Sequence, residues 1–164
     1  FGNIGSKVAE IAKAFEMEIL IYSRTNKQNN FPDYKFVSLE ELLKNSDFVT
    51  IHAPLNNETK HLINKEKIKM MKKSAYIINC SRGAIINQDD LIDALKNNVI
   101  EGAGLDVFEK EPLPMDNELR KLSNVALTPH NAFYTKEAVE RLTDICRGNI
   151  KNYFNKNPTN VVSK

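Results

Sequence analysis

Residues 75–105 read AYIINCSRGAIINQDDLIDALKNNVIEGAGL and contain two apolar runs on either side of an amphipathic segment. The run at 75–80 is typical of a short buried strand, and residues 88–98 place apolar side chains at helical spacing. A second apolar run follows at 100–108. Strand, helix and strand in this order predict two parallel strands joined by a helical crossover.

The same alternation extends along the chain in both directions. Further helices are predicted at 8–15, 38–46, 64–73, 116–122 and 135–154, and further strands at 18–22, 47–52 and 124–128. Ser38 and Glu41 have the spacing of a capping box at a helix start. Because no tight hairpin signal interrupts the pattern, we predict an α/β fold. It would be a doubly wound, Rossmann-like parallel sheet covered by helices on both faces.

The chain begins FGNIGSKVAE, in which Gly2-x-x-Gly5 precedes the first predicted helix. This spacing is that of the second half of a Gly-x-Gly-x-x-Gly phosphate loop. Gly2 and the free amides of Asn3 and Ile4 would then bind a pyrophosphate at the positive end of the helix. A doubly wound sheet also needs a strand that leads into this loop, and we expect the sheet of this chain to lack that first strand.

Two interpretations of this beginning are open. Residue 1 starts an unusual fold, or the chain is the cofactor lobe of a longer polypeptide, cut or supplied from within the phosphate loop. The second interpretation is favoured. Residues 1–154 are therefore predicted to form an N-terminally incomplete dinucleotide-binding domain, and residues 155–164 a tail that would return to an absent substrate domain.

The predicted strand at 18–22 ends in Ser23-Arg24-Thr25, where a dinucleotide would place its adenosine ribose. Loops that bind NAD have an acidic residue about 20 positions after the glycines, but none occurs between Ile19 and Pro32. A guanidinium flanked by two hydroxyls suits a 2′-phosphate, because arginine forms charge-assisted, bidentate bonds to an anion. NADP(H) is therefore favoured, with NAD(H) as the alternative. In the simpler interpretation Arg24 stacks on adenine or faces water.

Composition limits the class of protein. The 164 residues carry 23 basic and 21 acidic side chains, which suits one globular domain. The densest basic segment, KEKIKMMKK, has no interleaved aromatics, so we predict a solvated helix face and no nucleic-acid binding. No apolar run approaches the ~20 residues of a membrane span, so no membrane association is predicted. Cys80 and Cys146 are far apart, which favours a reduced, cytoplasmic setting, and the three histidines lack zinc spacing, so no metal is predicted.

Three stretches of the second half carry a resemblance: NCSRGAIINQDDLIDAL (79–95), GAGLDVFEKEP (102–112) and LTPHNAFYTKEA (127–138). In this order and spacing they resemble the D-isomer-specific 2-hydroxyacid dehydrogenase family, over nearly the whole chain. The resemblance implies an NAD(P)-dependent oxidoreductase that transfers a hydride between the nicotinamide and a small 2-oxo or D-2-hydroxy acid. It also implies a two-lobed, commonly dimeric protein. We therefore expect a homodimer, and no turnover from this chain alone.

The resemblance places the catalytic residues at Arg82, Glu111 and His130. A planar guanidinium can hold the carboxylate of a 2-oxo acid and polarise its carbonyl. An imidazole can supply the proton that the developing alkoxide needs, and a neighbouring carboxylate favours its protonated form. Taken singly, Arg82 would be a surface arginine, Glu111 a solvated loop acid and His130 a structural histidine. Their joint occurrence at the family spacing favours catalysis.

Other positions match family stretches that lie against the cofactor. They are His52, Pro54, Thr59, Cys80, Ser81 and Asp106, with His130 itself. The alternative for His52 is a buried histidine at a strand end. The Cys80 thiol is expected to be incidental to catalysis, and Cys146 is expected in the core.

The substrate is left open by two conflicting signals. Phe133 and Tyr134 resemble the D-lactate dehydrogenase branch, in which aromatic residues crowd a small pocket, so Phe133 joins Arg82 as a predicted substrate contact. The SRT at 23–25 and the FEKEPLP at 108–114 look more like the glyoxylate and hydroxypyruvate reductases. The candidates are therefore glyoxylate, hydroxypyruvate and pyruvate.

Two alternatives come from other classes of protein. Relatives of this fold act as non-catalytic, dinucleotide-sensing corepressors, a role that would not require Arg82, Glu111 and His130 to be intact. A nucleotide-binding module that works as this fragment is disfavoured by the incomplete phosphate loop. The tail FNKNPTNVV (154–162) has little to pack on in either case and is predicted to be mobile.

Overall fold

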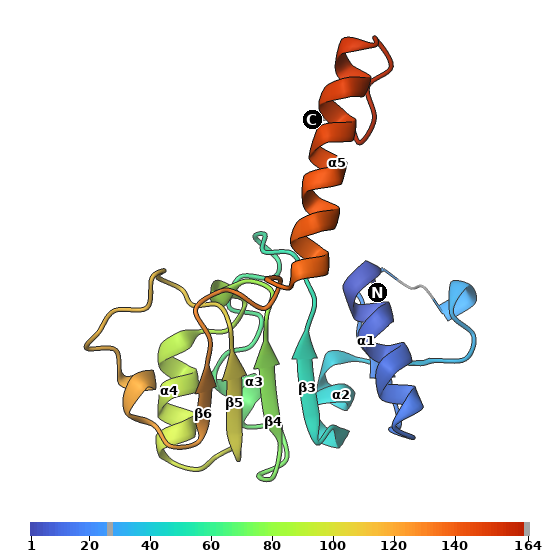
Figure 1. Ribbon diagram of the computed structural model, residues 1–164. Helices are drawn as coiled ribbons and strands as arrows, with labels where there is room; N and C mark the ends of the chain where they lie inside the picture. Colours follow the sequence, from blue (N-terminus) through green and yellow to red (C-terminus); the bar gives the residue numbers. More distant parts are fainter. Residues whose placement is uncertain (26–27, 163–164) are drawn as a thin grey trace. The chain divides into compact units, whose positions relative to one another are not determined.

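Four parallel strands form the larger sheet of the computed structural model, which describes residues 1–25 and 28–162 (Figure 1). They are β3 (Phe48–Ile51), β4 (Tyr76–Asn79), β5 (Gly102–Leu105) and β6 (Val125–Leu127), in that order across the sheet. All of them fall inside predicted strands, and the strand-helix-strand unit predicted at 75–105 is confirmed.

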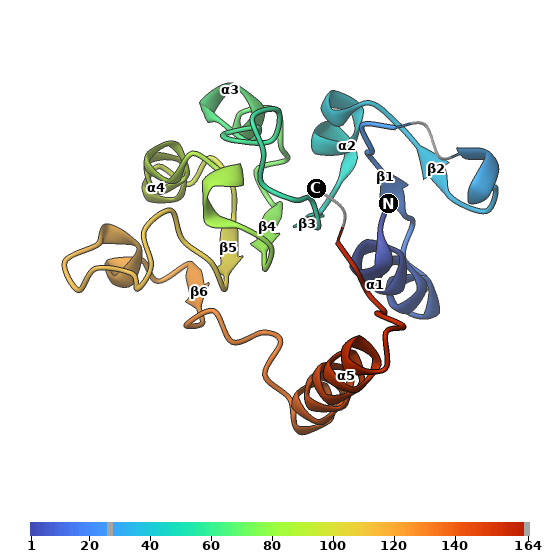
Figure 2. The ribbon, with the colours of Figure 1, turned by 90° about the horizontal axis from the view of Figure 1, so that it is seen from above.

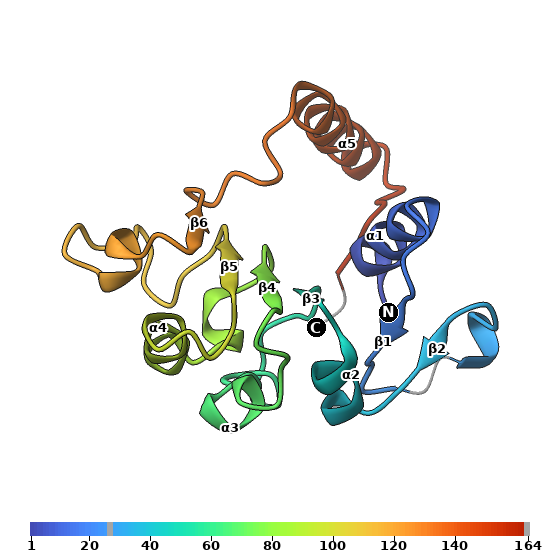
Figure 3. The ribbon, with the colours of Figure 1, turned by 90° about the horizontal axis from the view of Figure 1, so that it is seen from below.

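A second, two-stranded parallel sheet pairs β1 (Leu20–Ile21) with β2 (Lys35–Phe36). Strand β2 was absent from the sequence prediction, because two residues are too short to display a period. The described residues therefore contain two parallel sheets rather than the single doubly wound sheet predicted. Figures 2 and 3 show β1 and β2 beyond the β3 edge of the larger sheet.

Four α-helices accompany the sheets in the described part of residues 1–130, and all but the first begin at a side-chain cap. They are α1 (Asn3–Ala14), α2 (Leu39–Asn45), α3 (Lys65–Ile68) and α4 (Gln88–Lys96), with 3-10 turns at η1 (Gln28–Asn30), η2 (Gly83–Ile85) and η3 (Glu118–Lys121). The Ser38 hydroxyl accepts the Glu41 amide at 3.1 Å, as the capping box predicts. Helix α3 is shorter than the predicted 64–73, and the helix predicted at 116–122 is the 3-10 turn η3.

The core lies between the larger sheet and helices α2, α3 and α4, which line one face of it (Figure 2). Strand register places Val49, Ile77, Ala103 and Val125 in one row across the sheet. The first three are buried and the last partly buried. Side chains alternate in β3, where Phe48 is exposed. The opposite face is thus less buried than the doubly wound prediction implies.

The chain divides into two compact units, Phe1–His130 and Asn131–Lys164. In the second unit, α5 (Lys136–Phe154) begins at Thr135, whose hydroxyl accepts the Ala138 amide at 3.2 Å. None of its side chains is buried, and the prediction of a core position for Cys146 is wrong. The helix carries exposed apolar side chains, among them Leu142 and Ile145.

The segment after α5 is hydrogen-bonded to that helix. Asn152 Nδ2 donates to Thr159 Oγ1 at 3.0 Å, and Asn160 Nδ2 donates to Asn149 Oδ1 at 2.8 Å. The mobility of the tail stays a prediction, as does the functional boundary at 154/155, and residues 163–164 of the tail lie outside the described residues. None of the described helices is long and apolar enough to cross a membrane.

Candidate functional site

The candidate site lies where parallel strands end, because their carboxyl ends meet at one edge of a sheet. Strand β4 ends at Asn79 and leads into Ser81 and Arg82. Strand β5 leads into Asp106, and β6 leads into the segment that reaches His130. Three of the predicted segments are thus brought to the same edge by the topology.

Asn79 shapes the turn that carries Arg82. It is only 1% exposed. Its Oδ1 accepts the Ser81 amide at 3.0 Å and the Ser81 hydroxyl at 3.2 Å, and its Nδ2 donates to the Arg82 carbonyl at 2.9 Å. The Arg82 side chain is exposed, and its Nη1 donates to the Ser81 carbonyl at 2.7 Å. A buried amide thus fixes the backbone while the guanidinium faces solvent.

The Arg82 turn touches the loop that carries Glu111. A Cβ at Gly83 would lie 2.0 Å from the Phe108 carbonyl carbon and 2.5 Å from the Glu109 nitrogen. Only glycine fits so close an approach of two backbones. The segments 81–83 and 108–109 are therefore packed directly against each other.

Glu111 and His130 form a hydrogen-bonded pair. Glu111 Oε2 lies 2.7 Å from His130 Nδ1, and the Phe108 amide donates to Oε1 at 2.9 Å. Partial burial raises the pKa of Glu111, but the bonds from His130 and Phe108 outweigh it and leave that pKa below its ordinary value. With Nδ1 held by the carboxylate, Nε2 is the nitrogen left to face a reactant. His130 also adopts a left-handed backbone, with φ 54°, which a non-glycine residue rarely does.

Asp106 is buried beside this pair of loops. It is 2% exposed, its Oδ1 accepts the Thr128 hydroxyl at 2.5 Å, and its amide donates to the Asn79 carbonyl at 3.0 Å. Burial, and then the charge of Asp106, raises the pKa of the Cys80 thiol. A raised pKa disfavours the thiolate, and the expectation that the Cys80 thiol is incidental to catalysis stays a prediction.

The opposite side of the candidate site is built around the start of α1. Gly2 is its N-cap and makes no side-chain cap hydrogen bond, and the first turn has no acidic residue. A Cβ at Gly5 would lie 3.4 Å from the His52 Cβ, so α1 packs closely on the segment after β3. Burial lowers the pKa of His52, whose Nε2 lies 3.0 Å from the Thr50 hydroxyl.

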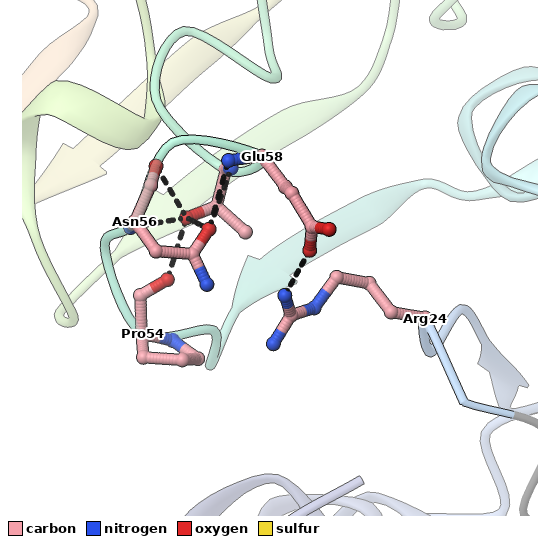
Figure 4. Close-up of polar contacts among 5 residues, drawn as sticks. Arg24, Pro54, Asn56 and Glu58 are labelled. Atoms are coloured by element: carbon pink, nitrogen blue, oxygen red, sulfur yellow. Dashed lines mark hydrogen bonds and ion pairs between the residues drawn. The ribbon is translucent and has the colours of Figure 1, made fainter. Parts of the chain in front are cut away.

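The loop after β3 is a hydrogen-bonded turn, in which Figure 4 labels Pro54, Asn56 and Glu58. Thr59 is only 1% exposed, and its hydroxyl donates to the Pro54 carbonyl at 2.6 Å. Asn56 Oδ1 accepts the amides of Glu58 and Thr59, both at 3.0 Å. Thr59 therefore supports the turn, and contact of Thr59 or Pro54 with a cofactor stays a prediction.

Ser23, Arg24 and Thr25 follow β1, and Arg24 forms an ion pair with Glu58 of this turn (Figure 4). The turn after β3 and the end of β1 are thus in contact. Helix α1 has 12 residues and begins without a side-chain cap, so its first amides are free to donate. Together with the arginine and hydroxyl side chains at the end of β1, these amides form a donor set that fits the phosphates of a dinucleotide.

Sequence reasoning missed a second histidine-carboxylate pair. His61 Nε2 lies 3.0 Å from Glu109 Oε1, which also accepts the Gln88 amide at 3.0 Å. The pair ties the loop after β3 to the start of α4 and to the loop of Glu111. No local spacing signals it, because the three residues come from separate segments. Nor did the sequence signal Asn79 or Glu58.

Phe133, predicted to contact substrate, belongs to the second unit. It is exposed and packs edge-on against Tyr134, with ring centroids 6.0 Å apart. Its predicted role stays a prediction. Among residues 1–25 and 28–162, no group of three or more His, Cys, Asp or Glu side chains could hold a metal ion.

The parallel sheets, the uncapped helix start and the polar strand ends together define a dinucleotide-binding domain. Residues 1–132 match the family model "D-isomer specific 2-hydroxyacid dehydrogenase, NAD binding domain", and the chain belongs to this family. It is 44% identical to a glyoxylate reductase of Thermococcus litoralis, over all of this chain and 50% of that protein. It is 46% identical to a glyoxylate reductase of Pyrococcus horikoshii, over 91% of this chain and 45% of that protein.

Solved structures agree with this assignment. D-lactate dehydrogenase with NAD+ from Lactobacillus jensenii superposes with a TM-score of 0.92 at 31% identity, over 99% of this chain and 53% of that one. An acyclic imino acid reductase in complex with NADPH and D-Arg gives 0.88 at 36% identity, over 99% and 51%. The chain thus spans about half the length of the relatives it matches.

Proposed function

We propose that this chain is the cofactor lobe of an NAD(P)-dependent D-2-hydroxyacid dehydrogenase that interconverts a small 2-oxo acid and its D-2-hydroxy acid. The observation that carries the proposal is the 2.7 Å contact between Glu111 and His130, beside a turn that presents Arg82. Gly83 holds that turn against the loop of Glu111. The loop that carries Glu111 therefore contacts both His130 and the turn of Arg82.

Each catalytic residue has a distinct task in this proposal. Arg82 binds the substrate carboxylate and polarises the adjacent carbonyl through charge-assisted bonds. His130 donates a proton from Nε2 to the carbonyl oxygen during reduction and accepts it during oxidation. Glu111 orients the imidazole and stabilises its charge. The nicotinamide, when bound, supplies or accepts the hydride.

The cofactor would lie across the two sides of the candidate site. The amides of Asn3 and Ile4, after Gly2, would hold the pyrophosphate at the start of α1. Ser23, Arg24 and Thr25 would hold the adenosine ribose, which favours NADP(H), with NAD(H) as the alternative. The other predicted cofactor contacts are His52, Pro54, Thr59, Cys80, Ser81, Asp106 and His130. Related structures hold NAD+ in one case and NADPH in another.

The complete fold is also part of the proposal. Within the described residues, β1 and β3 each have one edge without a paired strand. A further parallel strand between these edges would join the two sheets into one doubly wound sheet. Because the relatives are about twice as long as this chain, the complete protein would supply this strand and a substrate domain. A homodimer is proposed as its assembly.

The test is oxidation of NADPH and NADH by the complete protein with glyoxylate, hydroxypyruvate and pyruvate. We expect one oxo acid to be reduced, and Arg82→Ala to lower turnover by orders of magnitude while cofactor binding persists. A cofactor-sensing binding protein would show no turnover in either form. That result would refute the enzymatic proposal.

A further inference from the structure

The carboxylate of Glu58 meets the side chain predicted to read the cofactor ribose. Its Oε2 pairs with Nη1 of Arg24, which lies 34 residues earlier in the sequence (Figure 4). No acidic residue occurs between Ile19 and Pro32, the interval in which a loop that binds NAD has its acidic residue. The structure thus brings a carboxylate to the end of β1 from another loop.

The position of Glu58 is set by its turn rather than by Arg24 alone. Asn56 Oδ1 accepts the Glu58 amide at 3.0 Å, and the buried Thr59 closes the turn on the Pro54 carbonyl at 2.6 Å. The Glu58 side chain is 70% exposed and that of Arg24 is 45% exposed. The backbone is therefore preorganised, while the charged groups can exchange their partners.

We infer that Glu58 is a specificity residue that competes with a 2′-phosphate for Arg24 and so weakens the preference for NADP(H) over NAD(H). This inference rests on the proposed function. A 2′-phosphate binds by displacing Glu58 from the guanidinium, and the displaced carboxylate stays close to the incoming anion. A 2′-hydroxyl carries no charge, so NAD(H) binding meets neither cost.

The expected effect follows from the exposure of the pair. Exposed ion pairs contribute little, so removing the competitor improves the affinity for the phosphorylated ligand by about two- to fivefold. The same change leaves the affinity for the unphosphorylated ligand nearly constant. The preference between NADPH and NADH shifts by that factor.

The experiment measures binding rather than turnover. Dissociation constants of NADPH, NADH, adenosine 2′,5′-bisphosphate and 5′-AMP are measured calorimetrically on the complete protein, as wild type, Glu58→Gln, Arg24→Gln and the double variant. Glu118→Gln is the matched control, because Glu118 pairs with Lys96 at similar exposure and is not among the proposed cofactor contacts. Thermal melting confirms that each variant is folded.

We expect Glu58→Gln to tighten NADPH and the bisphosphate by about two- to fivefold, with Glu118→Gln unchanged. The gain should shrink in the Arg24→Gln background, since the two residues act as a pair. Unchanged NADPH binding in Glu58→Gln, an equal gain for NADH, or an undiminished gain without Arg24 would each overturn this inference alone. If the wild-type protein binds neither dinucleotide, the proposed function fails and the inference fails with it.

Discussion

Replacing Gly83 by alanine should destabilise the protein because of a steric conflict that the structure locates. The added Cβ would lie 2.0 Å from the Phe108 carbonyl carbon, 2.1 Å from its oxygen and 2.5 Å from the Glu109 nitrogen. These are backbone atoms, so no side-chain rotation relieves the overlap. Overpacking costs about 1–3 kcal/mol, and contact with backbone puts Gly83→Ala at the upper end.

Gly104→Ala is the matched control for the same change. Its added Cβ would make ordinary contacts, 3.8 and 3.9 Å from two carbons of Ile78. None of the described glycines has a positive φ, so neither variant is strained by its backbone conformation. At a compatible site, glycine to alanine stabilises by about 0.4–1 kcal/mol through the unfolded chain. The two variants should therefore change the free energy of unfolding in opposite directions, with Gly83→Ala lowering it and Gly104→Ala raising it.

The assay is calorimetric unfolding of the complete protein in the wild type and both variants. A domain of this size shifts its Tm by about 2–4 °C per kcal/mol. Gly83→Ala should thus melt several degrees below the wild type, and Gly104→Ala at or slightly above it. The loss should be accompanied by weaker substrate binding, since the Arg82 turn must retreat from the loop of Glu111. Equal melting of Gly83→Ala and wild type would refute the packing argument.

Three further predictions concern charge and capping. Because the folded pKa of Glu111 is depressed, its pairing with His130 contributes stability above the ordinary carboxylate pKa and loses it as the pH falls through the folded value. Glu111→Gln should remove this acid-dependent loss in melting curves recorded from pH 7 downward. Asp106→Asn should lower the pKa of Cys80 and speed its alkylation by iodoacetamide at fixed pH, and unaltered kinetics would contradict the assigned electrostatic effect. Ser38→Ala should cost about 1 kcal/mol in urea unfolding, with Ser38→Gly costing less.

Local pattern was sufficient for much of the fold. A four-residue strand such as β4 has a run of apolar side chains that the sequence shows directly, and Ser38 has a cap signal within three residues of its partner. The contact between Glu111 and His130 was anticipated only through the family resemblance. Their separation of 19 residues leaves no local signal.

Other features were lost because their causes are not local. Strand β2 is only two residues long, too short to show an alternation of apolar and polar side chains. It is recognised as a strand only by its pairing with β1. Cys146 lies on an amphipathic helix, which predicts burial, but burial also requires a partner surface. None of the side chains of α5 is buried. Periodicity thus indicates which face of a helix is apolar, and only the tertiary structure shows whether that face is covered.

The cofactor region shows the same limit at the level of chemistry. Read locally, Ser23, Arg24 and Thr25 form a site for a 2′-phosphate, and the absence of a nearby acid supports NADP(H). The structure adds the carboxylate of Glu58 to the same guanidinium from a loop beyond β3. Specificity for a phosphate depends on the total charge around it, whatever the sequence distance between its neighbours. A preference for NADP(H) over NAD(H) that is inferred from residues 23–25 alone leaves out the charge of Glu58. On the inference above, it therefore overestimates how well Arg24 discriminates between the two cofactors.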